Sequence, residues 1–454
     1  MSMLPRARIA IAALGLIAGL ATVLALPAAS PRAVAQTQSN ERPGGLLPLD
    51  LLRQPIPDTS PHAEQLRRGQ YLVAAGDCMS CHLREGGEPL AGGLALNTPF
   101  GVIYAPNITS DKETGIGDWT ADQFYQAMHR GLDNEGTNLY PAFPYPWFTI
   151  VSREDDDAIL AFLKTTPAVK YTAPANNLNF PLGFRFLVKG WNFLYLDARE
   201  FADDPTHSPE WNRGAYLVNG LGHCGGCHTP KGALGADRSG REFHGGTLDS
   251  WVAPDLTAND RTGLGAWSID DLTEYLGTGR NARAGAGGAM AEVITYSTSL
   301  LSETDRHAMA VYLKSLAASP SVAVTQPDAG AMRRGAAIYS DACASCHLEN
   351  GVGQPGYFPP LGHDAMLQQA EPLGLEHLIL AGGRIGTSPT RPSPMTMPSF
   401  AWKLSDEEVA DVSTFIRNSW GNQAAAVSVA EVRAARKKLN LDTVHLTANS
   451  GDQN

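Results

Sequence analysis

All six cysteines of this 454-residue chain lie in three copies of one pattern, Cys-x-x-Cys-His. The copies read CMSCH, CGGCH and CASCH, at residues 78–82, 224–228 and 343–347. A chain of this length favours about three domains, and three motifs spaced along it agree with that number. We therefore expect three domains with one motif in each.

Four chemistries compete for such a cysteine pair. A structural zinc site usually joins two pairs, and a thioredoxin-like pair lies beside a βαβ pattern without needing a histidine. A disulfide is possible in an exported protein, but it does not explain a histidine after all three pairs. In c-type haem attachment, both thiols form thioethers to the porphyrin and the adjacent histidine ligates the iron. The sequence thus predicts three c-type haems attached through Cys78, Cys81, Cys224, Cys227, Cys343 and Cys346, with His82, His228 and His347 as iron ligands.

The sequence around each motif is also repeated. A run of the type RGQYLV, RGAYLV or RGAAIY precedes each cysteine pair and predicts a short amphipathic helix. Each repeat closes with a serine followed three residues later by an acid, a helix-start signal, and then by apolar residues at helical spacing. Phe162, Tyr312 and Phe415 occupy matching places on these closing helices. We predict an all-α fold of three tandem monohaem domains at 62–167, 207–317 and 327–420, with a linker at 168–206 and a polar tail at 421–454.

The first 35 residues differ from the rest. Arg6 and Arg8 precede an apolar run at 9–26, and Ala33-Val34-Ala35 offers a cleavage site, so residues 1–35 are predicted to be a signal peptide. An uncleaved anchor is the alternative, because the run is just long enough to span a bilayer. Either way, the folded part is expected outside the cytoplasm. The net charge of −11 disfavours a nucleic-acid partner.

Two further segments carry open interpretations. Residues 180–201, FPLGFRFLVKGWNFLYLDAREF, are rich in aromatics but interrupted by Arg185, Lys189 and Asp197, so they are not expected to span a membrane. We favour a segment that wraps across domain surfaces over a docking strip for a partner. The basic patch at 428–439 is either a helix on a membrane surface or, more commonly, a solvated helix.

With these features the chain resembles the three-haem cytochrome c subunits of bacterial membrane-bound dehydrogenases, over about residues 62–420. Besides the haem motifs, the resemblance rests on specific strings, among them APNITSDKETGIGDW, NLYPAFPYPWFT, WNRGAYLVNGLGHCGGCHTPKGALG and MPSFAWKLSDEEV. It implies three cytochrome c domains that carry electrons from a periplasmic catalytic subunit, oxidising an alcohol, sugar, sugar acid or aldehyde, to ubiquinone or a terminal oxidase.

The resemblance also implies a place at the outer face of the cytoplasmic membrane, by peripheral association, and no substrate chemistry on this chain alone. The catalytic subunits of the family are of flavin, quinoprotein or molybdenum type, and the sequence does not choose between them. Two other functions stay open: a peroxidase-like haem enzyme that uses an open iron in the first domain, and a freestanding electron shuttle.

Methionine is a common second axial ligand beside histidine, and its thioether raises the reduction potential. In the second domain we predict Met290, expected on a loop in GAGGAMAEV, with core filling as the alternative. The third domain offers Met395 and Met397 in SPMTMPSF, and the resemblance favours Met397 because it matches the family's Met-Pro-x-Phe pattern. Arg280 is a candidate partner for a haem propionate on grounds of charge.

The first domain departs from this pattern. When the middle helices are aligned on Gly131, Gly279 and Gly383, Phe143 falls where the other domains place methionine, and Met128 falls on a core position. His129 is the best substitute ligand, with a surface histidine as the alternative, and an iron without a strong sixth ligand is also possible. Both arrangements predict that the first haem has the lowest potential of the three.

Overall fold

The computed structural model describes residues 47–321 and 323–442. The predicted signal peptide and the last residues of the tail lie outside this range. Within it, no helix combines the length and the hydropathy needed to cross a membrane.

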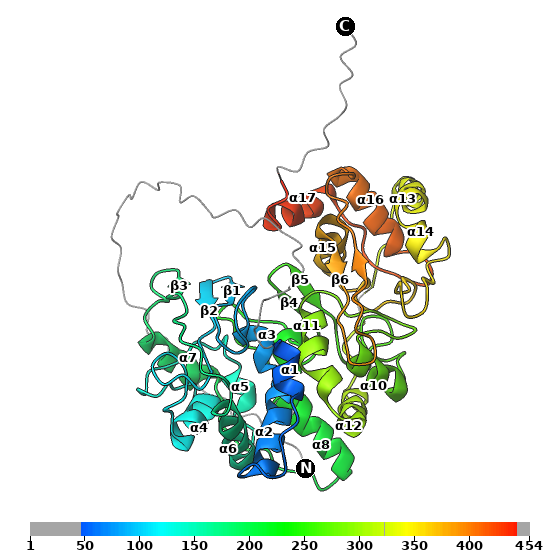
Figure 1. The fold of residues 1–454 in the computed structure, drawn as a ribbon. Coiled ribbons are helices and arrows are strands. Elements are labelled where there is room, and N and C mark those ends of the chain that lie inside the picture. The colour runs from blue at the N-terminus through cyan, green and yellow to red at the C-terminus, as the bar shows by residue number, and fades with distance from the viewer. Residues whose placement is uncertain (1–46, 322, 443–454) are drawn as a thin grey trace, which may run out of the picture. The chain divides into compact units, whose positions relative to one another are not determined.

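The described part is mostly helical, as predicted (Figure 1). A short helix, α1 (Pro48–Arg53), precedes the first set, which is α2 (Ala63–Ala75), α3 (Cys78–His82), α4 (Ala121–Arg130), α5 (Tyr145–Phe148) and α6 (Arg153–Leu163). The second set is α8 (Pro209–Asn219), α9 (Cys224–His228), α10 (Ile269–Thr278), α11 (Ala289–Tyr296), η1 (Thr298–Leu300) and α12 (Glu303–Lys314). The third is α13 (Ala329–Ala342), α14 (Ala344–His347), α15 (Leu373–Ala381), α16 (Asp406–Ile416) and α17 (Val429–Lys438). Each set contains a first helix, a motif helix, a middle helix and a closing helix in that order, and the closing helices are α6, α12 and α16.

Between these helices run small antiparallel strands that the sequence patterns did not predict. The first sheet has the order β1 (Ala95–Thr98), β2 (Gly101–Tyr104) and β3 (Asn177–Leu178). The other two are the pairs β4 (Gly246–Leu248) with β5 (Trp251–Ala253) and β6 (Gly383–Arg384) with β7 (Thr396–Met397). The segment 168–206 also contains a helix, α7 (Phe186–Tyr195).

The predicted starts of the three closing helices are confirmed. The Oγ atoms of Ser152, Ser302 and Ser405 accept hydrogen bonds from the backbone N–H groups three residues later, at 3.2, 3.1 and 3.2 Å. These side chains satisfy helix N–H groups that have no partner within the helix.

In each domain the first and last helices meet at a glycine. A Cβ added at Gly69, Gly214 or Gly335 would lie 1.9, 2.0 or 2.2 Å from a backbone carbonyl oxygen of the closing helix. Those oxygens belong to Ala158, Ala308 and Asp411, and the Cβ atoms of Phe162, Tyr312 and Phe415 are the next neighbours. Because any Cβ would overlap backbone, only glycine permits this approach.

The first two domains are joined by a reciprocal pair of tyrosines. The hydroxyl of Tyr71 donates to Asp305 Oδ2 at 2.5 Å, and the hydroxyl of Tyr216 donates to Asp155 Oδ2 at 2.6 Å. Each tyrosine therefore bonds to the helix-capping segment of the other domain. The backbone N–H groups of Ser302 and Ser152 in turn donate to these hydroxyls, at 3.2 and 3.1 Å.

Each of these carboxylates also holds an arginine of its own domain. Arg68 Nε donates to Asp155 Oδ1 at 2.6 Å, and Arg213 Nε donates to Asp305 Oδ1 at 2.8 Å. Burial alone raises the pKa of Asp305, but the hydrogen bonds from Arg213 and Tyr71 outweigh it and hold that pKa below its usual range.

The third domain lacks this link. Arg334 still pairs with its closing helix, through Asp411 at 2.6 Å, but Ala337 stands where the other two domains have tyrosine. Accordingly, one hydrophobic core runs through the first and second domains and a separate one fills the third. Helix α17, placed in the predicted tail, adds Val432 and Ala435 to that second core.

The glycine contact predicts a large effect of a single methyl group. Gly214→Ala should destabilise the protein by about 2–3 kcal/mol, because the Cβ displaces backbone rather than a flexible side chain. Thermal unfolding of the haem-loaded protein measures it. Gly190→Ala is the matched control, since a Cβ there meets no atom within 4 Å, and it should be neutral or slightly stabilising. Equal effects at the two sites would contradict the role of the contact.

The tyrosine pair predicts that removal of either hydroxyl lowers the stability of the protein. Tyr71→Phe and Tyr216→Phe each remove a hydrogen bond to a carboxylate, which should cost about 1–2 kcal/mol of unfolding free energy. Tyr195→Phe is the control, because that tyrosine is exposed. Denaturant unfolding of the three variants checks this, and an unchanged midpoint for Tyr216→Phe would show that the interface does not depend on it.

Candidate haem sites

The imidazole rings of the three motif histidines are oriented in the same way. Their Nδ1 atoms lie 2.7, 2.6 and 3.0 Å from the carbonyl oxygens of Pro106, Pro254 and Pro359, for His82, His228 and His347 respectively. A proton on Nδ1 that is donated to a carbonyl leaves Nε2 unprotonated and available to a metal.

The backbone of each histidine is fixed as well. The N–H groups of Gly92, Gly245 and Gly353 donate to the carbonyl oxygens of the three histidines, at 2.8, 2.9 and 3.1 Å. At Gly92 a Cβ would lie 2.2 Å from Pro106 O, so the loop that fixes the backbone also reaches the atom that fixes the ring. Each histidine is thus held from two sides before any iron is bound.

Burial shifts the pKa values of the motif side chains. It lowers the pKa of His82, His228 and His347, which favours the neutral imidazole that ligates iron. It raises the pKa of Cys78 and Cys224 to about 12, which favours the protonated thiol. Among residues 47–321 and 323–442, no three His, Cys, Asp or Glu side chains cluster so as to hold a metal ion.

The two predicted axial methionines lie against the core of their domains. Met290 sits in the first turn of α11 and not on a loop, so that expectation is wrong; Gly288, at φ 59°, lets the chain enter the helix directly after the glycine-rich turn. Met397 ends β7 and pairs with Gly383 of β6. Both side chains are half-buried.

Phe143 is half-buried at the corresponding place in the first domain and packs on the shared core. Its ring meets Phe148 edge-on, at 5.5 Å between centroids. The match of Phe143 to the methionines rests on aligning the three middle helices on the glycines that follow them. In the third domain the glycine that caps the helix, α15, is Gly382, at φ 78°, and not Gly383. Met128 is buried, as predicted.

His129 is buried and paired, so it is not the surface histidine offered as the alternative to ligation. Its Nε2 lies 2.9 Å from Asp156 Oδ2, and its ring stacks on Tyr125 at 3.8 Å. Burial raises the pKa of Asp156 to about 6, although the hydrogen bond from His129 opposes the rise. Ligation of iron through Nε2 requires that this buried contact be broken.

Comparison with known proteins places the chain in a family. The cytochrome c family model matches residues 332–420. The cytochrome c subunit of gluconate 2-dehydrogenase from Pantoea cypripedii is 40% identical over 394 residues, covering 82% of this chain and 89% of that protein. The cytochrome c subunit of alcohol dehydrogenase (quinone) from Gluconobacter oxydans is 37% identical, covering 82% of each. The fructose dehydrogenase cytochrome subunit of Gluconobacter japonicus is 35% identical, covering 86% of each.

The chain belongs to the cytochrome c subunits of membrane-bound dehydrogenases. It is therefore an electron-transfer subunit of a quinone-linked dehydrogenase complex, and it binds haem c.

In this cytochrome subunit, Trp147 of the first domain reaches the motif of the second. A Cβ at Gly225, inside CGGCH, would lie 2.0 Å from the Trp147 ring, and Trp147 also meets Phe243 at 6.2 Å. The next residue, Phe148, contacts His223 edge-on at 5.3 Å. The sequence patterns did not predict this contact. The one sign of it in the sequence is the Gly-Gly pair of CGGCH, where CMSCH and CASCH have larger residues.

The contact is reciprocated by the second domain. Helix α11, which carries Met290, packs against α3 of the first motif. Burial raises the pKa of Cys81 to about 12, and the nearby charges of Asp77 and Cys227 add to the rise. The first and second motifs therefore lie near each other. Trp147 of the first domain covers the second motif, and α11 of the second domain covers the first motif.

Arg280 supports the expectation of an anionic haem group. It is 8% exposed, its Nη1 donates to Gly356 O at 3.0 Å, and its Nε is buried without a hydrogen-bond partner among the described residues. Burial and then the neighbouring Arg391 lower its pKa. A buried guanidinium without a carboxylate fits a haem propionate.

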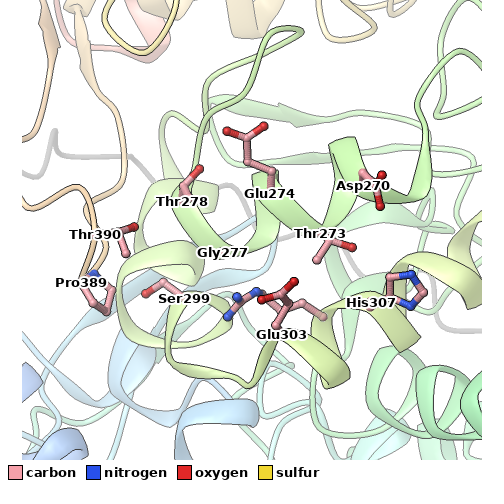
Figure 2. Close-up of a pocket in the computed structure, with 11 residues that line it drawn as sticks. Asp270, Thr273, Glu274, Gly277, Thr278, Ser299, Glu303, His307, Pro389 and Thr390 are labelled. Atoms are coloured by element: carbon pink, nitrogen blue, oxygen red, sulfur yellow. The ribbon is translucent and has the colours of Figure 1, made fainter.

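A solvent-open pocket lies elsewhere, between the second domain and a loop of the third (Figure 2). Its polar lining includes Asp270, Glu274, Glu303 and His307, with Pro389 and Thr390 from the third domain. No cysteine or histidine of the three motifs lines it, so it is not part of the haem sites.

The place of Phe143 yields a prediction about potentials. Phe143→Met should raise the lowest reduction potential of the protein by on the order of 0.1 V, because axial ligation tunes haem potentials over a wide range. A spectroscopic redox titration measures it. Phe143→Leu is the control, and an unmoved lowest step in the methionine variant would contradict the equivalence of the three slots. Because His129 Nε2 is paired with Asp156, His129→Ala should leave the haem spectrum unchanged.

Proposed function

We propose that this subunit carries three covalently bound haems and passes electrons from a periplasmic catalytic subunit to ubiquinone or a terminal oxidase. The observation that carries the proposal is the threefold repetition of one histidine site. In each copy a proline carbonyl orients the ring, a glycine N–H holds the backbone, and a one-turn helix ends at the histidine. This helix contains both cysteines in the first two copies, and Cys343 is its N-cap in the third.

The chain's own residues would position the haems and shield them from water. When bound, haem supplies one-electron redox chemistry. Cys78 and Cys81, Cys224 and Cys227, and Cys343 and Cys346 would attach the three haems, and His82, His228 and His347 would ligate the iron. Met290 and Met397 are the proposed second ligands. In the first domain the corresponding position is held by Phe143, which has no atom that can ligate iron.

The reciprocal packing of the first two domains suits electron transfer between their sites. The shared core and the tyrosine pair fix the distance between the two motifs, so little structural rearrangement accompanies a change of charge. Trp147 and α11 cover part of the two motifs, and this cover lowers the local dielectric around them.

The donor and the acceptor are proposed from the relatives. Their names specify gluconate, alcohol and fructose dehydrogenases, and one specifies a quinone. We infer a catalytic subunit of flavin, quinoprotein or molybdenum type that oxidises a CH–OH or aldehyde group. A quinone acceptor dissolves in the lipid bilayer, which supports a location at the outer face of the cytoplasmic membrane by peripheral association.

Purification of the native complex tests the proposal. The expected result is three covalent haems per chain by pyridine haemochrome assay, together with a catalytic subunit whose substrate reduces all three. Cys224→Ala with Cys227→Ala should leave two haems. One haem per chain, or steady turnover of hydrogen peroxide by the isolated subunit, would overturn the proposed role.

A further inference from the structure

Helix α7 turns its apolar side away from the protein. Phe186, Phe193 and Leu194 are 68%, 75% and 62% exposed, whereas Val188 is 6% exposed. The exposed residues fall on one face at helical spacing, and Gly190 lies in the middle of that face, where a Cβ would meet no atom within 4 Å. These three large apolar side chains are therefore mostly exposed to solvent.

The inward side of α7 is held by hydrogen bonds. Asn192 Oδ1 accepts from the hydroxyl of Tyr145 at 2.5 Å, and Asn192 Nδ2 donates to Arg130 O at 3.4 Å. Trp191 Nε1 donates to Leu234 O at 2.9 Å. A surface helix of a water-soluble domain normally buries its apolar stripe and exposes its polar one. Helix α7 departs from this rule, because most of its large apolar side chains are exposed together with Lys189. Its inward side buries Val188 and is held by the hydrogen bonds of Trp191 and Asn192.

The apolar face continues into the segment before the helix. Phe180 is 87% and Phe184 51% exposed, and the rings form a chain of contacts, 6.1 Å from Phe180 to Phe184 and 5.9 Å from Phe184 to Phe186. We call residues 180–195 the α7 strip. Contiguous exposed patches of this kind mark membrane or protein interaction sites.

Charge distinguishes between these two partners. The protein carries a net charge of −11, yet the α7 strip contains no acidic residue. Its charged residues are Arg185, which pairs with Asp133 Oδ2 at 3.0 Å, and Lys189, which is exposed. A basic, aromatic strip on an acidic protein is matched to an anionic lipid surface. Helix α7 has ten residues, about 15 Å of length, which suits a helix that lies in the interfacial plane.

We propose that the α7 strip inserts its apolar face into the outer surface of a phospholipid bilayer with anionic headgroups. This proposal rests on the membrane location inferred above and names the surface responsible for it. The basic patch at 428–439 is less suited to that role, because Arg436 is only 8% exposed and donates to Asp406 Oδ1 at 2.8 Å and to Ala401 O at 3.0 Å.

The α7 strip is hydrogen-bonded to residues 138–149 of the first domain. The hydroxyl of Tyr140 donates to Leu182 O and Gly183 O at 3.1 and 3.0 Å, and Tyr145 holds Asn192. Insertion of α7 would therefore bring the stretch that contains Phe143 to the bilayer surface.

Vesicle flotation of the exported, haem-loaded protein tests this proposal. The vesicles contain equal parts of phosphatidylglycerol and phosphatidylethanolamine. The variant Phe186→Ser with Phe193→Ser should lower the partition coefficient about tenfold or more, because two large apolar side chains no longer enter the interface. Trp402→Ser is the matched control, since Trp402 is 63% exposed in the third domain, and it should bind as the unmodified protein does.

Two further measurements separate this surface from the electron-transfer role. All variants should keep the full haem content, and the complex should still reduce a soluble acceptor such as ferricyanide at the unmodified rate. Equal flotation of the α7 variant and the unmodified protein would overturn the proposal, as would failure of the unmodified protein to bind vesicles. An α7 variant that floats normally but no longer co-purifies with the catalytic subunit would also overturn it and assign the strip to a protein partner.

Discussion

The contact of backbone on backbone at one glycine per domain is the constraint from which the rest of each domain follows. Because the first helix approaches the closing helix without an intervening Cβ, the arginine that directly precedes the glycine lies beside an acid of the closing helix. Arg68, Arg213 and Arg334 all make such a pair. The motif follows within ten residues of the glycine, so the same contact fixes where the cysteines are presented.

One position on that first helix decides how the domains associate. Where it is tyrosine, as at Tyr71 and Tyr216, the hydroxyl reaches the acid of the other domain and the two domains share a core. Where it is Ala337, the domain keeps a core of its own. The third domain instead meets the second through polar contacts such as Arg280 to Gly356 and Gln369 to Thr262, at 3.0 and 2.6 Å. The first two sites thus lie on one shared core.

The sequence predicted the features whose cause is local. Cysteine spacing, serine caps and the repeated glycines are all written within a few residues, and the matching places of Phe162, Tyr312 and Phe415 follow from helical periodicity. It did not predict contacts that depend on tertiary placement. Met290 lies on a helix because Gly288 adopts a left-handed conformation that composition alone does not reveal. The pairing of His129 with Asp156 and the packing of Trp147 on Gly225 join residues far apart in the chain.

The contacts made by the stretch NLYPAFPYPWFT, at 138–149, explain its unusual composition. Its aromatic residues point to different partners: Tyr140 and Tyr145 bond to the α7 strip, Phe143 packs on the core, and Trp147 covers the second motif. A regular helix presents side chains on one stripe toward one neighbour, whereas three prolines limit the stretch to a single helical turn, α5. An irregular backbone is therefore required for one short segment to connect the outward-facing helix with two domains.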